Sequence, residues 1–130
     1  MLRPVLTFVG LLGLCAAYIQ GGLNKLLDFP GAVAEAVHFG LPLPTATAAA
    51  TIALELVASA MILTGRGRWI GALALMGFTL AATAIANRYW ELSPGRERFM
   101  MANSFYEHLG LAGAFLLVTL WDRALRERAA

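Results

Sequence analysis

The stretch ATAAATIALELVASAMILT, residues Ala46 to Thr64, decides the fold because it is long enough to cross a membrane and carries a single charge. A helix of about 20 residues spans the ~30 Å of hydrocarbon in a bilayer. Glu55 stands at its centre, nine residues from either end. An unpaired carboxylate at that depth costs at least ~3 kcal/mol, so we expect a buried cationic partner. Lys25 is the obvious candidate.

The rest of the chain has the composition of an integral membrane protein. Of its 130 residues, 59% are hydrophobic and 14% are charged, and the uncharged runs are too long for a soluble core of this size. Three more apolar segments have spanning length, which gives predicted helices over residues 5–27, 46–64, 69–87 and 103–121. We therefore expect an all-α, four-helix transmembrane bundle that forms one domain over residues 1–130.

The connections between the spans differ in length. We expect a short amphipathic helix over Ala32–Phe39 between the first two spans, lying in the membrane interface as a lid over the bundle. The second connection, Gly65–Arg68, is a tight turn that is too short to hold a site. In the third connection, Tyr89 and Trp90 are expected at the aromatic belt of the membrane surface.

The basic residues predict the orientation of the bundle. Six arginines fall on the side of the two termini, while three arginines and Lys25 fall on the other side. This excess predicts a multi-pass protein of the bacterial cytoplasmic (inner) membrane with both termini in the cytoplasm. The pI near 9.1 then follows from topology and from contact with anionic lipid, so nucleic acid is not an expected partner.

Polar side chains recur along one face of each predicted span. Residues four apart share a face of a helix, so such stripes are expected to point into the bundle. The stripes are Thr47, Thr51, Glu55 and Ser59; Thr79, Thr83 and Asn87; Asn103 and Glu107, with Ser104 and His108 beside them; and Tyr18, Gly21 and Lys25, with Asn24 beside them. With the termini inside, most of the charged and amide groups lie near the outer ends of the spans. We expect them to converge on one polar cavity that opens to the outer side.

Two interpretations of these stripes compete. Threonine and serine hydroxyls at this spacing often bond the carbonyl oxygen four residues back, and a buried ion-pair network can serve only to fix helix packing. Ionisable groups inside a membrane are expensive to keep, so Lys25, Glu55, Glu107 and His108 together favour a functional site. Gly22 is a further candidate, because a glycine near Lys25 leaves room for a flat molecule beside the ammonium.

The single cysteine limits the redox chemistry that the chain can perform. Cys15 lies inside the first span among Leu14, Ala16 and Ala17, and we expect it to be a small packing residue. Thiol–disulfide exchange needs a second thiol, so disulfide chemistry is expected only in a partner.

Five segments of the chain carry a family resemblance. They are YIQGGLNKLLDFPG (Tyr18–Gly31), Gly40-Leu-Pro42, Glu55 in its alanine-rich helix, Gly65-Arg66, and FYEHLGLAG (Phe105–Gly113). In their order and spacing these segments resemble the DoxX family of small four-helix membrane proteins, and the resemblance covers nearly the whole chain. It implies a membrane oxidoreductase or an accessory subunit of one, in a family whose name comes from a thiosulfate:quinone oxidoreductase. No sulfur-handling, haem or flavin motif is visible in the chain, which argues against thiosulfate chemistry here.

The function we favour is that of a quinone-interacting subunit or small membrane oxidoreductase. In this hypothesis Lys25 or His108 donates a hydrogen bond to a quinone carbonyl oxygen, while Glu55 or Glu107 takes or relays the proton that quinol oxidation releases. A carboxylate in hydrocarbon holds its proton more tightly than in water, which suits proton exchange near neutral pH. Membrane lipid and a redox partner protein complete the expected partners. The other predicted cofactor-binding residues are Asn24, Gly22, Tyr18 and Asn103.

Three alternatives remain open. The chain can be a non-catalytic subunit that anchors a redox partner, with the ionisable cluster serving assembly alone. Metal or haem binding is suggested by Glu35-x-x-His38 together with the other carboxylates and His108, although only one Glu-x-x-His occurs. Transport is weaker, because the chain lacks two halves that each contain a broken helix.

Overall fold

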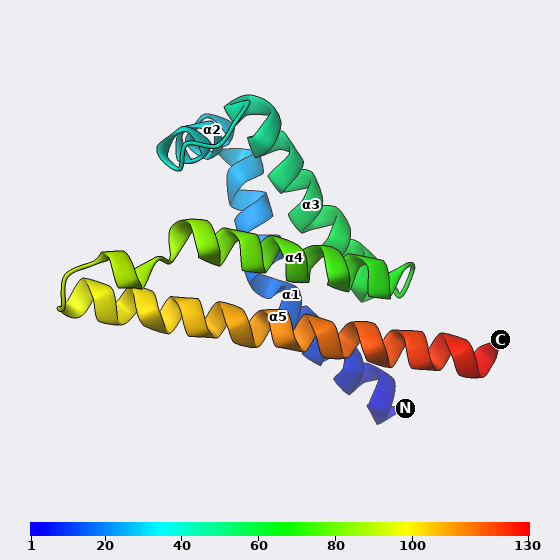
Figure 1. Ribbon diagram of the computed structural model, residues 1–130. Coiled ribbons are helices and arrows are strands. Elements are labelled where there is room, and N and C mark those ends of the chain that lie inside the picture. The colour runs from blue at the N-terminus through cyan, green and yellow to red at the C-terminus, as the bar shows by residue number, and fades with distance from the viewer.

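The computed structural model describes residues 1–130 in full and is helical throughout, with no strands. Four of its helices are long and apolar enough to cross a membrane. The elements are α1 (Leu2–Leu27), α2 (Phe29–His38), α3 (Pro44–Thr64), α4 (Arg68–Ala86), the 3-10 turn η1 (Tyr89–Glu91) and α5 (Arg96–Ala129) (Figure 1). The prediction of an all-α bundle with four spans is confirmed.

All five helices differ from their predicted bounds, and α1, α3 and α4 do so by no more than three residues at either end. The differences at α5 and α2 have a clear physical reason. The last helix begins at Arg96 and ends at Ala129, well beyond the predicted 103–121, because the apolar pattern marks only the part that lipid surrounds. A short helix does lie between the first two spans, but it begins at Phe29 rather than Ala32. Asp28 caps it by accepting a hydrogen bond from the Gly31 backbone N–H (3.1 Å), so Phe29, Pro30 and Gly31 form the first turn of α2.

The direction of the helices alternates along the chain. Both termini and the turn between α3 and α4 lie at one end of the molecule, and α2 and η1 lie at the other (Figure 1). We call these the terminal end and the η1 end. α4 packs against α5, α3 against both α1 and α4, and α2 against α3. Residues far apart in sequence therefore meet at each end.

The core lies in the middle of the bundle and is built around Tyr18. Its ring meets the rings of Phe115 (centroids 5.3 Å apart) and Phe78 (6.4 Å apart) edge to face, which is a favoured geometry for aromatic pairs. Cys15 is fully buried in the same cluster, and this confirms its expected packing role. α3 and α4 approach closely at Gly71, where a Cβ would lie 2.7 Å from the Ala58 carbonyl oxygen.

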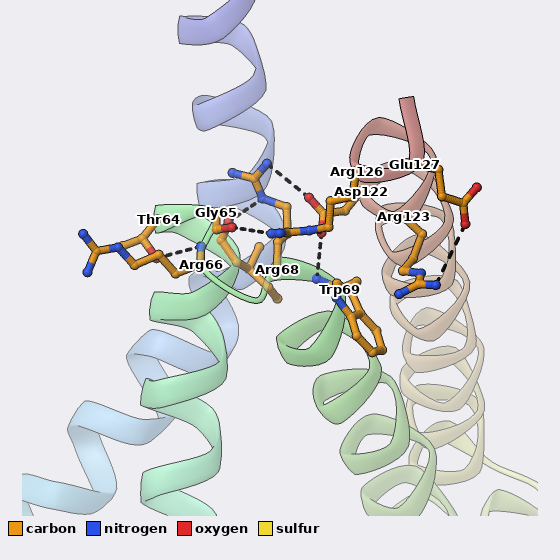
Figure 2. Close-up of polar contacts among 10 residues, drawn as sticks. Thr64, Gly65, Arg66, Arg68, Trp69, Asp122, Arg123, Arg126 and Glu127 are labelled. Atoms are coloured by element: carbon orange, nitrogen blue, oxygen red, sulfur yellow. Dashed lines mark hydrogen bonds and ion pairs between the residues drawn. The ribbon is translucent and has the colours of Figure 1, made fainter. Parts of the chain in front are cut away.

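The terminal end is closed by a buried carboxylate that the sequence stripes did not include. Asp122 of α5 accepts hydrogen bonds from the Trp69 backbone N–H (3.2 Å) and from Arg126 Nε (2.8 Å). Arg126 also donates to the Gly65 carbonyl oxygen (2.8 Å) in the α3–α4 turn. Figure 2 shows the Asp122 side chain directed from α5 toward that turn, with Arg68 directed toward Asp122. These bonds tie the tight turn to the last helix.

Candidate functional site

The predicted partnership between Glu55 and Lys25 is present. Lys25 Nζ lies 2.7 Å from Glu55 Oε1, which joins α1 to α3. The Glu55 side chain is 5% exposed and the Lys25 side chain 23% exposed. A hydrogen-bonded ion pair removes most of the cost of placing the carboxylate among apolar helices.

Only one oxygen of Glu55 is used in this pair. Oε1 accepts the bond from Lys25, whereas Oε2 faces Gly21 of α1. A Cβ on Gly21 would lie 3.0 Å from that oxygen and 3.6 Å from Lys25 Nζ. Gly21 therefore makes room for the ion pair and leaves Oε2 free for another donor.

The neighbouring glycine has a different role from the one expected. Gly22 is buried against α3, where a Cβ would lie 2.7 Å from Leu56 Cδ2. No room for a flat ligand exists beside Gly22, because Leu56 fills that space. The expected function of Gly22 is thus corrected to close packing of α1 on α3, and the glycine that lies against the ion pair is Gly21.

A polar cavity of about 260 Å³ lies beside the ion pair. Every long helix and α2 contribute polar side chains to its wall, so the predicted convergence of polar groups from separate spans occurs. The polar lining residues are Tyr18 and Lys25 of α1, Glu35 of α2, Glu55 of α3, Thr79 and Asn87 at α4, and His108 of α5.

A second cavity of about 240 Å³ adjoins the first and is mostly apolar. It lies between α2, α3 and α4, with Phe39, Leu41 and Ile85 among its walls. Lys25 and Glu35 are charged residues shared by both cavities. We call the first space the polar cavity and the second the apolar chamber. Together they offer one end for a hydrogen-bonding head and one for a hydrocarbon part.

Hydrogen bonds orient the other polar side chains in and around the two cavities. The hydroxyls of Tyr18 and Thr79 bond each other across α1 and α4. Thr83 Oγ1 donates to Asn87 Oδ1 (3.1 Å). Thr51 Oγ1 donates to the Thr47 carbonyl oxygen four residues back, which is the backbone bonding anticipated for such hydroxyls.

The tautomer of His108 follows from its partner. His108 Nδ1 lies 2.6 Å from the Ser104 carbonyl oxygen. A carbonyl oxygen can only accept, so Nδ1 carries the hydrogen and Nε2 of the neutral ring is an acceptor. His108 is therefore suited to receive a hydrogen bond or a proton at Nε2, and a neutral His108 cannot donate one there.

Three predicted site residues lie elsewhere. Asn24, Asn103 and Glu107 are exposed and line neither the polar cavity nor the apolar chamber. Glu107 directly precedes His108 on α5, and successive helical residues point about 100° apart. The stripe that faces inward is therefore the neighbouring one, which contains Ser104 and His108.

Glu35 is the site residue that the sequence interpretation missed as part of the polar cavity. It appeared only as a candidate metal ligand beside His38. In the structure no group of three or more His, Cys, Asp or Glu side chains is arranged to hold a metal ion, and the His38 ring packs edge to face on Phe39. The available signal was the spacing of Ala32 and Ala36, two small residues four apart on one face of α2. The structure buries both, and Glu35 beside them lines the cavity.

Comparison with known proteins adds the family context. The sequence model of the DoxX family matches residues 6–88. The chain is also 28% identical over 118 residues to the inner membrane protein YphA of Escherichia coli strain K12, with 91% of this chain and 84% of that protein covered. No solved structure matches the chain. The relative and the four apolar helices together support a multi-pass protein of the bacterial inner membrane.

Proposed function

This chain belongs to the DoxX family, and on that premise we propose that it is a redox-associated membrane protein that binds a quinone. The observation that carries the proposal is the junction of the polar cavity and the apolar chamber at Lys25. A molecule with a flat hydrogen-bonding head and a hydrocarbon tail matches such a pair of spaces. The head group lies beside the ion pair, and the tail runs between α2, α3 and α4.

The polar residues divide the work of binding and proton exchange. Lys25 Nζ keeps its bond to Glu55 Oε1 and has two further hydrogens, one of which it donates to a quinone carbonyl oxygen. His108 Nε2 accepts a hydrogen bond from the hydroxyl of the reduced form. The hypothesis that His108 donates to a carbonyl is replaced by this acceptor role.

Proton transfer uses two acceptors. Oxidation of a hydroquinone to a quinone releases two protons and two electrons. Glu55 Oε2 and His108 Nε2 each take one proton, since both atoms lack a partner in the structure. The two electrons pass to a redox partner protein that carries an electron-accepting centre. The chain thus acts as the quinone-binding and proton-exchanging part of a larger system.

The orientation predicted from sequence forms part of the proposal. Arg66 lies in the α3–α4 turn and Arg128 in the last turn of α5, both at the terminal end. Lys25 and Arg96 lie at the η1 end. By the positive-inside rule the terminal end faces the cytoplasm and the η1 end faces the opposite side of the membrane.

Quantification of bound quinone tests the proposal. The protein is purified in a mild detergent, the co-extracted quinone is measured by chromatography, and a quinone titration gives the affinity of the emptied protein. We expect Lys25→Ala to weaken binding by about tenfold or more, because a charged donor is lost. The matched control is Arg88→Ala, whose partner Glu91 is exposed at the surface. An empty preparation whose quinone affinity is the same in Lys25→Ala contradicts the proposal.

A second candidate function is that of an accessory subunit that anchors a redox partner. It is favoured by Asn103 and Glu107, which are exposed on α5. Under this alternative Glu55→Gln changes the yield of the complex and leaves the activity of the partner intact. Copurification of the partner with each variant separates this function from quinone binding.

A further inference from the structure

A third hollow lies at the η1 end, outside the two cavities of the proposed site. It is an open groove of about 560 Å³ between the end of α4 and the first turns of α5. Both signs of charge occur on its walls, so the groove does not select an ion by charge. Its lining residues are Asn87, Arg96, Glu97, Met100, Met101 and Ser104.

Asn87 lines the groove and the polar cavity alike. It stands at the C-terminal end of α4, and its carbonyl oxygen Oδ1 accepts the hydrogen bond from Thr83. The amide NH₂ of Asn87 is therefore left to donate to other groups. Asn87 is the one lining residue that the two spaces share.

On α5, residues of the groove and of the polar cavity also lie close together. Ser104 lines the groove and His108 lines the polar cavity. The two residues lie one helical turn apart, and the Ser104 carbonyl oxygen bonds His108 Nδ1. The His108 ring, which lines the polar cavity, thus lies one helical turn from a residue that lines the open groove.

We propose that the polar cavity has its own aqueous mouth at Asn87, through which water and protons exchange with the η1 end. The apolar chamber, on the other side of Lys25, then serves as the separate opening for a hydrocarbon tail. Asn87 is the positioning residue of the mouth, and its free amide hydrogens hold the water that connects the groove to His108. The mouth rests on the geometry of the groove, and only the origin of the protons rests on the proposed function.

Thiol labelling in lipid nanodiscs tests the mouth directly. The wild-type protein is the blank, because Cys15 is fully buried. A positively charged methanethiosulfonate reagent is added to His108→Cys, and the extent of modification is followed by mass spectrometry. Asn103→Cys, at an exposed position of the same helix end, is the reactive control. Leu117→Cys, 67% exposed on the lipid-facing part of α5, is the control that a charged reagent does not reach.

We expect His108→Cys to react, and a bulky side chain at the mouth to slow the reaction. Asn87→Phe combined with His108→Cys reduces the labelling rate by about tenfold, the change that ~1.4 kcal/mol of added barrier produces. Ser104→Phe is the second blocking variant. Neither blocking variant changes the labelling of Asn103→Cys.

Two results overturn the mouth. In one, His108→Cys and Leu111→Cys, which line the same cavity, both stay unlabelled in folded protein where Asn103→Cys reacts. In the other, the blocking variants leave the rate unchanged. Adding a quinone to Leu111→Cys, which keeps every proposed binding residue, separates this inference from the proposed function: if Leu111→Cys reacts through the mouth but quinone gives no protection, the mouth stands and quinone binding fails.

Discussion

Each end of this bundle buries one carboxylate, and the two are treated differently. Glu55, toward the η1 end, and Asp122, at the terminal end, are both 4% exposed. Both oxygens of Asp122 face donors, with Oδ2 bonded to Trp69 N and Arg126 Nε and Oδ1 lying 4.0 Å from Arg68 Nη1. Glu55 has one partner, Lys25, and a free oxygen beside a cavity.

Asp122 and Glu55 show how a buried carboxylate that only holds helices together can be distinguished from one that belongs to a functional site. Burial alone does not distinguish Glu55 from Asp122, because the cost of desolvation is similar for both. The two carboxylates are distinguished by the number of donors that each one meets and by whether a cavity adjoins it. Asp122 lines none of the three cavities described above, so we expect its loss to affect stability and the loss of Glu55 to affect chemistry.

The largest expected effect is the loss of stability in Asp122→Ala. This variant leaves the Trp69 N–H without its acceptor. It also removes the counter-charge of Arg68, whose side chain is 17% exposed and whose Nε keeps its bond to the Ile62 carbonyl oxygen. Removing one partner of such a buried pair costs about 3 kcal/mol or more. The measurement is unfolding in mixed micelles followed by circular dichroism. Glu127→Ala is the control, since its pair with Arg123 is exposed and is worth less than ~1 kcal/mol. Equal stability of the two variants would contradict the stabilising role of Asp122.

Glu55→Gln is expected to show the reverse pattern, with a chemical defect and little unfolding. The cavity solvates the Lys25 ammonium that loses its counterion, so the stability loss is about 1 kcal/mol. Without the carboxylate, oxidation of bound quinol by ferricyanide slows about 100-fold, as expected for loss of a proton acceptor. The control is Glu107→Gln, which lies outside the cavity. A wild-type oxidation rate in Glu55→Gln, measured optically, contradicts the assigned role of Glu55.

The sequence predicted the parts of this structure that a membrane imposes. Four spans follow from hydropathy and length, and the pairing of Glu55 with Lys25 follows from the cost of an unpaired charge. Both are consequences of the solvent and need no knowledge of how the helices rotate. The fold and the ion pair at the centre of the candidate site could therefore be predicted from the sequence alone.

Helix rotation and helix ends account for what was missed. Glu107 and His108 are adjacent, and which of them faces the cavity depends on how α5 packs, which one sequence does not determine. The same holds for Gly21 and Gly22 on α1. Asp122 was missed for another reason: charges at the end of a span are usually solvated, and one of its partners is the Trp69 backbone N–H, which no residue pattern reveals.

A smaller expected effect concerns the stability that close helix contacts give to each end of the bundle. Gly71 faces the Ala58 carbonyl oxygen, a backbone atom that cannot rotate away, whereas Gly22 faces the flexible end of Leu56. We expect Gly71→Ala to destabilise the protein by about 2 kcal/mol and Gly22→Ala by about 1 kcal/mol, because overpacking costs depend on what can move. Unfolding midpoints in mixed micelles give both values. The reverse order would mean that α1 and α3 are the tighter pair.

The smallest expected effect concerns the hydroxyl bond at the edge of the polar cavity. Tyr18→Phe removes the partner of Thr79, which normally costs ~1 kcal/mol for a neutral hydrogen bond. Because Thr79 lines the cavity, water can replace the lost hydroxyl there, so we expect a loss well below that figure. Thr119→Val is the matched control, since the Thr119 hydroxyl bonds only the Phe115 carbonyl oxygen of its own helix. Parallel unfolding titrations measure both variants. A loss several times larger in Tyr18→Phe would show that water does not reach Thr79, and the contrast between an open η1 end and a closed terminal end would then be smaller than the cavities indicate.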